Sequence, residues 1–428
     1  MNNLRCSCNA FCAIVVAALL AGCAGSALPI STSSAMSRTI TNASSSAEQV
    51  LHRFGYRNSE GGAEPNSPLI NVNGIFYGTT EYGGPCPPHQ KNVCGYGTVF
   101  GINATGAKKV LYQFQGGASD GARPAGGLIE FNGALYGTTY EGGGSGCSGL
   151  GCGTVYSISP SGSEKVLYRF RGGSDGASPS GALVAVNGTL YGTTSAGGVV
   201  KGCSGSGCGS VYDITTSGSE QVLYRFGGSS SIAGWLPIGH LIDVNGALYG
   251  VTSVGGVQCD GYSFGCGTAY KIRTSGAATS LYAFGSGQEF PDGSLVEVQG
   301  ALYGTAGGET QSGTVYKLNM HGAYTMLYHF HGGQDGSTPI GGLIYAKGLL
   351  YGVTESGGVG CATNGCGTIF SITTTGSKTT IYSFPGEPNG ANPVAALLFS
   401  KDKLYGTTKA GGNSQCGDGC GTAFEVSP

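Results

Sequence analysis

The segment Leu135–Thr139 reads LYGTT, and variants of this phrase recur along the whole chain. Seven copies are present, and successive copies are 48 to 59 residues apart. Repeats of this length are typical of propellers and solenoids, in which each unit buries its faces against its neighbours. The sequence therefore predicts seven repeat units. Their central tyrosines are Tyr77, Tyr136, Tyr191, Tyr249, Tyr303, Tyr351 and Tyr405.

One repeat unit, residues 126–170, contains four strand-like runs: GGLIEF, ALYGTT, GTVYSI and KVLYRF. The first two runs are joined by Asn132-Gly133, and Asn-Gly between apolar runs is a strong hairpin signal because both residues accept positive φ. The last run alternates with the period of two that a strand requires. No segment has helical periodicity. We therefore predict an all-β fold with four antiparallel strands in each unit.

The two ends of the chain favour a closed ring. The strand VLHRF at Val50–Phe54 matches the fourth strand of a unit but precedes all other strands, whereas the last unit stops after its third strand, near Val426. An N-terminal strand that completes the last unit leaves no unpaired inner edge, whereas a solenoid would need polar capping repeats. Residues 50–428 are therefore predicted to form a seven-bladed β-propeller, closed by the N-terminal strand.

The first 22 residues resemble a bacterial lipoprotein signal peptide. Arg5 precedes an apolar run at 10–20, and small residues lead to Cys23, which would be acylated after processing. The alternatives are an ordinary secretory signal or a membrane anchor, although eleven apolar residues are too few to span a bilayer. The Ser/Thr/Ala-rich segment up to residue 49 is predicted to be a tether. Resemblance to Gram-negative lipoproteins implies the outer membrane, because Ala24 is not acidic.

Twelve of the sixteen cysteines form six local pairs, each in the loop between the second and third strands of a unit. In an oxidising compartment this pattern favours disulfides, each worth about 2 kcal/mol for a small ring. A metal site needs about four ligands at one point, and separate pairs do not supply them. We therefore expect no metal and no cofactor. The pairs are Cys86 with Cys94, Cys147 with Cys152, Cys203 with Cys208, Cys259 with Cys266, Cys361 with Cys366 and Cys416 with Cys420.

Loop lengths distinguish the two faces of the predicted ring. Tight turns join the first strand to the second and the third to the fourth, whereas the other two connections are long, and long loops on a rigid scaffold commonly carry binding residues. The connection between units often reads Asp-Gly-x-x-Pro. A ring of such acids near the axis is one hypothesis for a binding site, and turn-forming Asx residues are the alternative. The residues are Asp120, Asp175, Asp335 and Asn389.

The fourth unit departs from this connection. It carries Trp235, the only tryptophan of the chain, and His240. An exposed tryptophan beside a histidine suits stacking on a sugar ring or another flat ligand, whereas the alternative is a tryptophan that fills a gap in the packing. Both residues are candidate ligand-binding residues.

Signals for nucleic-acid binding or catalysis are weak. The net charge is −2 and no basic patch is evident, so nucleic acid is an unexpected partner. GGSDG at Gly172–Gly176 matches G-x-S-x-G, but that motif has meaning only between a strand and a helix. Glu81, Glu141 and Glu355 precede double glycines in different units. A glycosidase would need two such acids within roughly 5 to 10 Å of each other.

The repeated phrases LYGTT, GCGTVY and VLYRF, with a double glycine after the tyrosine, resemble the Gloeo/Verruco ("GloVer") tandem repeat of exported bacterial proteins, from Val50 to the C-terminus. The resemblance implies export but no defined activity and no catalytic residues. We expect a monomeric envelope protein, attached to the membrane only by lipid, that binds a glycan or protein without catalysis. A carbohydrate-active hydrolase or lyase and a structural scaffold are the alternatives.

Overall fold

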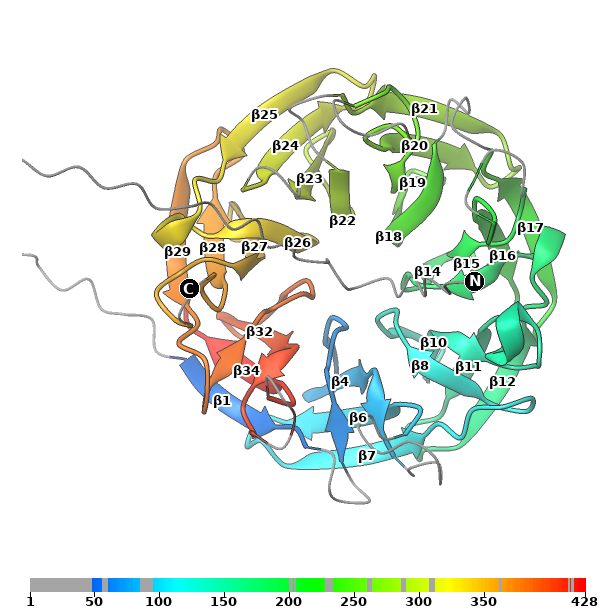
Figure 1. Cartoon of the computed structure of the whole chain (residues 1–428), viewed down its shortest axis with the longest axis horizontal. Helices are drawn as coiled ribbons and strands as arrows, with labels where there is room; N and C mark the ends of the chain where they lie inside the picture. The colour runs from blue at the N-terminus through cyan, green and yellow to red at the C-terminus, as the bar shows by residue number, and fades with distance from the viewer. Residues whose placement is uncertain are drawn as a thin grey trace, which may run out of the picture. The chain divides into compact units, whose positions relative to one another are not determined.

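The computed structural model describes residues 48–55, 61–84, 95–199, 203, 205–227, 234–259, 264–285, 290–307, 312–361, 364–414, 416 and 419–428. These residues form a seven-bladed β-propeller of antiparallel sheets, as the repeats predict. Figure 1 shows the blades around a common axis, with the first strand of each blade innermost and the fourth outermost. Within these ranges, no helix has the length and apolar character needed to cross a membrane.

The strands of the first three blades, from the axis outward, are as follows. Blade 1 contains β3 (Ile70–Val72), β4 (Ile75–Thr80), β6 (Thr98–Asn103) and β7 (Lys108–Gln113). Blade 2 contains β8 (Gly121–Pro124) and β9 (Ile129–Phe131), which share one edge, then β10 (Ala134–Gly142), β11 (Thr154–Ile158) and β12 (Glu164–Arg169). Blade 3 contains β13 (Ala177–Pro179) and β14 (Val184–Val186), then β15 (Thr189–Ala196), β16 (Ser210–Ile214) and β17 (Glu220–Arg225).

The next three blades have a continuous inner strand. Blade 4 contains β18 (Trp235–Val244), β19 (Ala247–Val254), β20 (Thr268–Arg273) and β21 (Ala278–Ala283). Blade 5 contains β22 (Phe290–Val298), β23 (Ala301–Gly307), β24 (Thr314–Asn319) and β25 (Tyr324–His329). Blade 6 contains β26 (Ser337–Ala346), β27 (Leu349–Ser356), β28 (Thr368–Ile372) and β29 (Lys378–Ser383).

The last blade combines the two ends of the propeller. It contains β31 (Leu398–Ser400), β32 (Lys403–Thr408), β34 (Thr422–Val426) and β1 (Glu48–Arg53). Two short pairs extend blades 1 and 7: β2 (Gly62–Ala63) with β5 (Tyr82–Gly83), and β30 (Gly390–Ala391) with β33 (Ala410–Gly411). Three short 3-10 turns lie in connections: η1 (Cys147–Gly149), η2 (Gly173–Asp175) and η3 (Gly333–Asp335).

The predicted closure is confirmed. β1 pairs antiparallel with β34, from Glu48 opposite Val426 to Arg53 opposite Thr422. Phe54 then packs against Phe100 of blade 1 with ring centroids 5.0 Å apart. The chain therefore closes the ring through backbone hydrogen bonds and an aromatic contact, which gives blade 7 four strands like the other blades.

Aromatic side chains hold each blade to the next. A phenylalanine after each fourth strand packs on an aromatic side chain in the third strand of the following blade, with centroids 5.0 to 5.2 Å apart. Phe226 and Tyr270, for example, are both fully buried. Such tilted and edge-to-face pairs add about 0.5 to 1.5 kcal/mol beyond the area they bury. The repeated aromatic residues therefore form the interfaces between blades.

Small residues surround the axis where the inner strands converge. A Cβ atom at Gly126 would collide with the carbonyl oxygen of Gly181, and one at Gly181 would collide with that of Gly239. Glycine is required at these positions because the backbones of adjacent inner strands are in near contact. The ring is therefore narrow at this level, and a ligand would have to approach from one of its faces.

Five of the predicted disulfides are present in the loops between second and third strands, with Cα atoms 5.2 to 5.6 Å apart. Each closes a ring of a few residues on the long-loop face. The observed pairs are Cys147–Cys152, Cys203–Cys208, Cys259–Cys266, Cys361–Cys366 and Cys416–Cys420.

The remaining cysteine predictions lie outside the described residues. Cys86 and Cys94 were expected to form the sixth disulfide, in the corresponding loop of blade 1, and both fall between the described residues 84 and 95. The pairing of Cys86 with Cys94 therefore stays a prediction. Cys23 and the expected signal and tether up to residue 47 also lie outside the described ranges.

Candidate functional site

The Asp-Gly-x-x-Pro acids lie at the outer edge of the ring. Asp120 accepts hydrogen bonds from the hydroxyl of Tyr112 in the outermost strand β7 (2.9 Å) and from a backbone N–H of the turn that follows (2.7 Å). Asp175 and Asp335 accept the equivalent pair of bonds in their blades. Asn389 holds the same place before blade 7, where its carbonyl accepts an N–H from a neighbouring loop. The three aspartates therefore act as turn-forming residues in the connections that follow the outermost strands, as the alternative predicted, and a ligand-binding role for the four residues stays a prediction.

Trp235 is buried, as the packing alternative predicted, and does not present an exposed ring. The residue is only 5% exposed and begins β18, where it pairs with Val254 of β19. Its ring meets Phe264 edge-on, with centroids 6.0 Å apart, and Leu236 packs in the same cluster. The packing alternative describes this side chain, because the blade-4 connection already joins the inner strand at Trp235.

His240 lies in the ring of small residues near the axis. Its Nδ1 is 2.7 Å from the hydroxyl of Ser294 in blade 5, and that hydroxyl also accepts the backbone N–H of His240 (2.9 Å). Burial lowers the pKa of His240 to about 4, so the imidazole is neutral at physiological pH. His240 thus joins blade 4 to blade 5, whereas Trp235 packs on Phe264 of its own blade.

Charged side chains do gather around the axis on the long-loop face, but they come from other positions of the repeat. One position is the residue before the proline of the connection, which has positive φ in six of the seven blades and is Glu64 in blade 1 (φ 55°) and Arg123 in blade 2 (φ 55°). Its N–H donates to the preceding blade just before that blade's third strand, as from Arg123 to Tyr96 (2.7 Å). The inter-blade hydrogen bond therefore fixes this residue near the axis.

The second position comes four residues after the central tyrosine of each unit, at or just beyond the end of the second strand. It is Glu81 in blade 1, Glu355 in blade 6 and Lys409 in blade 7, and in blade 2 the next residue, Glu141, is charged. Asp292, on the inner strand of blade 5, completes the group. We call these residues the axial arc: Glu64, Glu81, Arg123, Glu141, Asp292, Glu355 and Lys409.

Ion pairs connect the axial arc within and between blades. Lys409 Nζ of blade 7 lies 3.7 Å from Glu64 Oε2 of blade 1. In blade 2, Arg123 Nη1 lies 3.4 Å from Glu141 Oε1. The side chains in both pairs are 15 to 37% exposed, so they remain in reach of a ligand.

Neutral polar and aromatic groups lie among these charges. The Asn66 amide donates to Glu81 Oε2 (3.0 Å), and the Arg123 guanidinium lies over the Tyr82 ring, 5.2 Å from its centroid. The Asn66 carbonyl oxygen has no hydrogen-bond partner within the described residues. The arc therefore presents both donors and acceptors, together with the face of an aromatic ring.

Acids outnumber bases in the arc, and the pKa values reflect this. Burial raises the pKa of Glu64 and of Glu141, and the charge of Glu81 raises both further. Burial, followed by the charge of Glu355, raises the pKa of Asp292 to about 7. Five carboxyl groups thus share two cations, and Asp292 is about half protonated near neutral pH.

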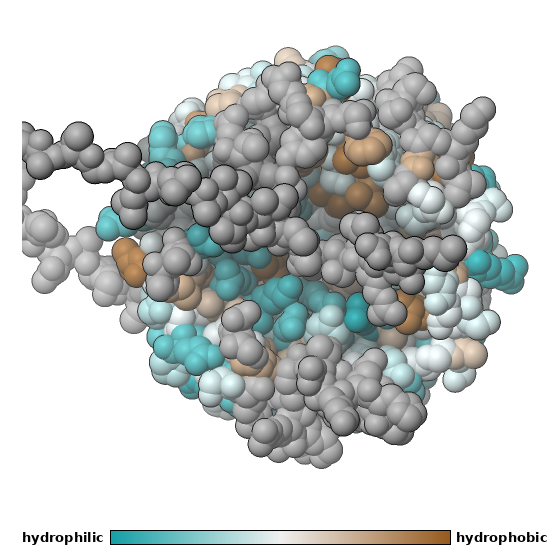
Figure 2. Space-filling model, viewed as in Figure 1, coloured by the Kyte–Doolittle hydropathy of each residue, from teal (hydrophilic) through white to brown (hydrophobic). Residues whose placement is uncertain are grey.

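The opposite side of the axial mouth is apolar. Leu236 of blade 4 (φ 59°) holds the repeat position of Glu64 and Arg123, and Ile238 holds that of Asn66. Figure 2 shows hydrophilic side chains around the axis on the side of blades 1, 2 and 7, and hydrophobic ones near β18 and β22, where Asp292 is the one charged member of the axial arc. The mouth therefore has a charged side and an apolar side.

Only part of this site is evident from the sequence. Glu81, Glu141 and Glu355 precede double glycines and lie on one face around the axis in the structure, whereas Arg123 and Asp292 have no comparable sequence signal. The usable signal was the alignment of the seven units, in which each arc residue replaces a small or apolar residue of other units. Which aligned position faces the axis depends on contacts between blades, and one repeat does not contain them.

The part of the chain that the structure describes contains no cluster of three or more histidine, cysteine, aspartate or glutamate side chains able to hold a metal ion. The carboxyl groups of the axial arc can instead serve as hydrogen-bonding groups. An ionised carboxyl group accepts hydrogen bonds, and a protonated one, which the raised pKa of Asp292 favours, also donates one.

The fold and the axial mouth define a propeller with one candidate binding face. The Gloeobacter/Verrucomicrobia repeat matches residues 39–264 and 148–363. The chain therefore belongs to the Gloeobacter/Verrucomicrobia repeat family, which confirms the resemblance seen in the repeated phrases. The disulfides and this family indicate an extracellular or envelope location.

Several solved structures are distantly similar. They include TolB from Acinetobacter baumannii (13% identity, TM-score 0.38, covering 66% of this chain and 58% of that one) and a putative 6-phosphogluconolactonase from Bacteroides fragilis NCTC 9343 (15%, 0.46, 79% and 88%). Puromycin hydrolase is a third (12%, 0.49, 82% and 50%). The chain spans just over half of TolB and half of puromycin hydrolase. These likenesses are too distant to bear on function, and no curated protein matches the sequence.

Proposed function

We propose that this protein binds a carbohydrate, without catalysis, at the axial mouth of its long-loop face. The observation that carries the proposal is the division of the mouth into the charged axial arc and the apolar side at Leu236 and Ile238. A sugar ring has hydroxyl groups around its edge and C–H groups on its faces. Carboxylates and a guanidinium form strong hydrogen bonds with hydroxyls, while apolar side chains cover the C–H faces.

The test is a glycan array probed with the full chain and with variants of the arc. Glu81→Gln and Arg123→Met remove charge from the mouth and are expected to weaken binding of the preferred glycan at least tenfold. Asp402→Asn changes an exposed acid in a short turn, away from the long loops, and should leave binding unchanged. Equal binding by all three variants, or binding only to a protein ligand, would refute the proposal.

A glycoside hydrolase is the second candidate, and one observation favours it. Asp292, with its raised pKa, still holds a proton near pH 7 and lies within electrostatic range of Glu355. A protonated acid beside a second carboxyl group is the arrangement that glycosidases use. Release of reducing ends from the glycans that bind, abolished in Asp292→Asn, would support hydrolysis. Binding without turnover would support the leading proposal.

We further propose that a lipid on Cys23 anchors the protein in the cell envelope. The proposal is supported by the apolar run and the small residues before this cysteine. Cys23→Ser should move the protein from the membrane fraction to the soluble fraction, and mass spectrometry of the N-terminal peptide should lose the acyl mass. An unmodified N-terminal peptide from the wild-type protein would refute the anchor.

A further inference from the structure

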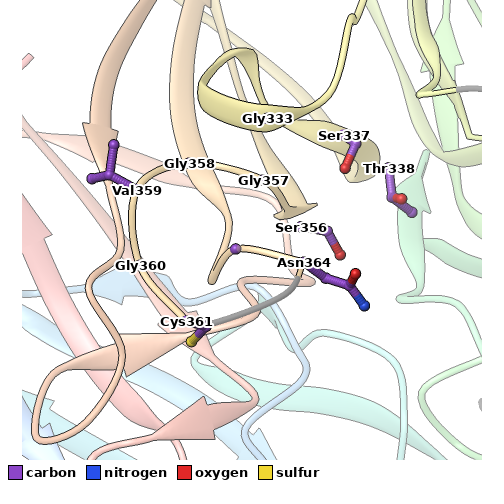
Figure 3. A pocket seen from close by; sticks show the side chains of 11 residues that line it. Gly333, Ser337, Thr338, Ser356, Gly357, Gly358, Val359, Gly360, Cys361 and Asn364 are labelled. Atoms are coloured by element: carbon purple, nitrogen blue, oxygen red, sulfur yellow. The ribbon is translucent and has the colours of Figure 1, made fainter. Parts of the chain in front are cut away.

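Blade 6 contains an open pocket of about 490 Å³ on the long-loop face. Its polar lining comes from Ser337, Thr338, Ser356 and Asn364, and glycine-rich backbone next to Cys361 forms the rest. Figure 3 shows the four polar side chains on one side of the pocket and the loop through Gly357 and Gly358 on the other. The volume lies within the range of roughly 300 to 1,000 Å³ that is usual for small-molecule sites.

Backbone carbonyl groups at this pocket accept hydrogen bonds, whereas its polar side chains make none within the described residues. The Asn364 carbonyl accepts the Gly357 N–H (2.6 Å), and the Ser356 carbonyl accepts the Thr354 hydroxyl (2.8 Å). Within the described residues, the side chains of Ser337, Ser356 and Asn364 make no hydrogen bond, and neither does that of Thr338. Three hydroxyls and one amide therefore offer donors and acceptors to a ligand.

In blade 4, bulky side chains occupy the space that corresponds to the blade-6 pocket. Phe264 corresponds to Asn364, because its carbonyl accepts the equivalent glycine N–H (2.8 Å). The strand pair Trp235 and Val254 corresponds to Ser337 and Ser356. In blade 4 these side chains fill the space that is open in blade 6.

The pocket adjoins the axial arc. Ser356 directly follows Glu355, and Thr338 (φ 56°) holds the repeat position that Glu64 and Arg123 hold in blades 1 and 2. A ligand at the axial mouth can therefore extend into blade 6. No side chain that lines the pocket is ionisable at neutral pH, because Cys361 is in a disulfide, so the lining selects neither a cation nor an anion.

We propose that the blade-6 pocket binds a neutral sugar ring of the glycan whose other part occupies the axial mouth. The inference rests on the proposed function and specifies its ligand as an oligosaccharide with at least one uncharged residue. The hydroxyl and amide groups hydrogen-bond to the sugar hydroxyls, and the glycine backbone allows close approach.

The experiment is calorimetric titration of the full chain with neutral trisaccharides: cellotriose, maltotriose, mannotriose and xylotriose. Asn364→Phe introduces the residue found in blade 4, Phe264, and fills the pocket. Ser356→Val introduces the residue found in blade 4, Val254, and removes a hydroxyl group. Each is expected to weaken the best trisaccharide at least tenfold. Ser206→Ala changes the position in blade 3 that corresponds to Asn364 and should bind as the wild type does. Melting temperatures confirm that each variant is folded.

The outcomes separate the pocket from the axial mouth. Loss of binding in both Asn364→Phe and Glu81→Gln supports an oligosaccharide that spans the two. Loss of binding only in Glu81→Gln would overturn the proposal of sugar binding in the blade-6 pocket and support binding at the axial mouth. Loss of binding only in Asn364→Phe would support the pocket and overturn the proposed binding at the axial mouth. Failure of all four trisaccharides to bind the wild-type protein overturns the blade-6 proposal.

Discussion

Blades 4 and 6 use one backbone plan for opposite purposes. At four equivalent positions blade 4 has Trp235, Leu236, Val254 and Phe264, whereas blade 6 has Ser337, Thr338, Ser356 and Asn364. The first set packs together and buries the tryptophan. The second set leaves an open pocket with free hydrogen-bonding groups. Four side chains thus determine whether a loop of this propeller is filled or hollow.

The comparison also shows where specificity can reside in a repeat protein. Inter-blade hydrogen bonds and aromatic contacts recur from blade to blade, and blades 4 and 6 both have a disulfide in the same loop, so these features belong to the common scaffold. Residues that differ at an otherwise repeated position change the chemistry of one blade without changing its backbone. Binding residues are therefore expected among the exceptions to the repeat.

The largest expected effect is that of emptying blade 4. Trp235→Ala should lower the free energy of unfolding by roughly 3 to 5 kcal/mol, because a buried aromatic side chain leaves a cavity. Urea unfolding followed by circular dichroism measures the change. Ser337→Ala, the same position in blade 6, should change stability by less than about 0.5 kcal/mol. Equal effects in the two blades would remove the distinction between them.

The disulfides should differ in importance in the same two blades. Replacing Cys361 and Cys366 with alanine should cost about 2 kcal/mol, as expected for a small closed ring. It should also expose the blade-6 loop to protease, because the described residues of this loop have no aromatic contact like that of Phe264 with Trp235. The matching replacement of Cys259 and Cys266 leaves the contact of Phe264 with Trp235 and should keep the blade-4 loop resistant. Limited proteolysis followed by mass spectrometry measures how fast each loop is cleaved. Earlier cleavage of the blade-4 loop than of the blade-6 loop would contradict the comparison.

Blade 5 lies between the two and carries Asp292 where blades 4 and 6 have Ile238 and Ile340. Its pKa is raised to about 7, above the unfolded value, so its contribution to stability is full below about pH 4 and is lost as the pH rises through 7. Between pH 4 and pH 8, the wild-type protein should therefore lose about 1 to 2 kcal/mol more unfolding free energy than Asp292→Asn does, after allowance for solvent screening. Asp292→Asn should lose less across this range, and urea midpoints at several pH values test this. An identical pH profile in the variant would show that Asp292 is not the responsible group.

The smallest expected effect is that of replacing Phe264, whose ring contacts Trp235 in blade 4. Phe264 is 55% exposed but meets Trp235 edge-on. Phe264→Asn should cost about 1 kcal/mol, the usual worth of such an aromatic pair, and should shift the tryptophan emission to the red as water reaches the indole. Leu150→Asn changes the same loop position in blade 2, where Ala122 replaces the tryptophan, and should be nearly neutral. An unchanged emission in Phe264→Asn would mean that Phe264 does not shield the ring.

Much of the architecture was predictable because it depends on local patterns. The period of the tyrosine phrase, the Asn-Gly turns and the separated strand at Val50–Phe54 indicate the number of blades, their strand order and the closure. The close spacing of each cysteine pair indicates the disulfides in the same way. These features need only contacts within one unit, or a count of units, and both can be read along the chain.

Tertiary structure alone decided which side chains reach the axis and which are buried. Asp120 and Glu64 both lie in connections between blades, yet one caps a turn and the other pairs with Lys409 of the adjacent blade 7. Trp235 interrupts a repeated connection, yet it is packed instead of exposed. The reason is that position relative to the axis depends on hydrogen bonds between neighbouring blades and on the path of each connection across the face. A single repeat does not encode those contacts, whereas the closed ring makes all of them at once.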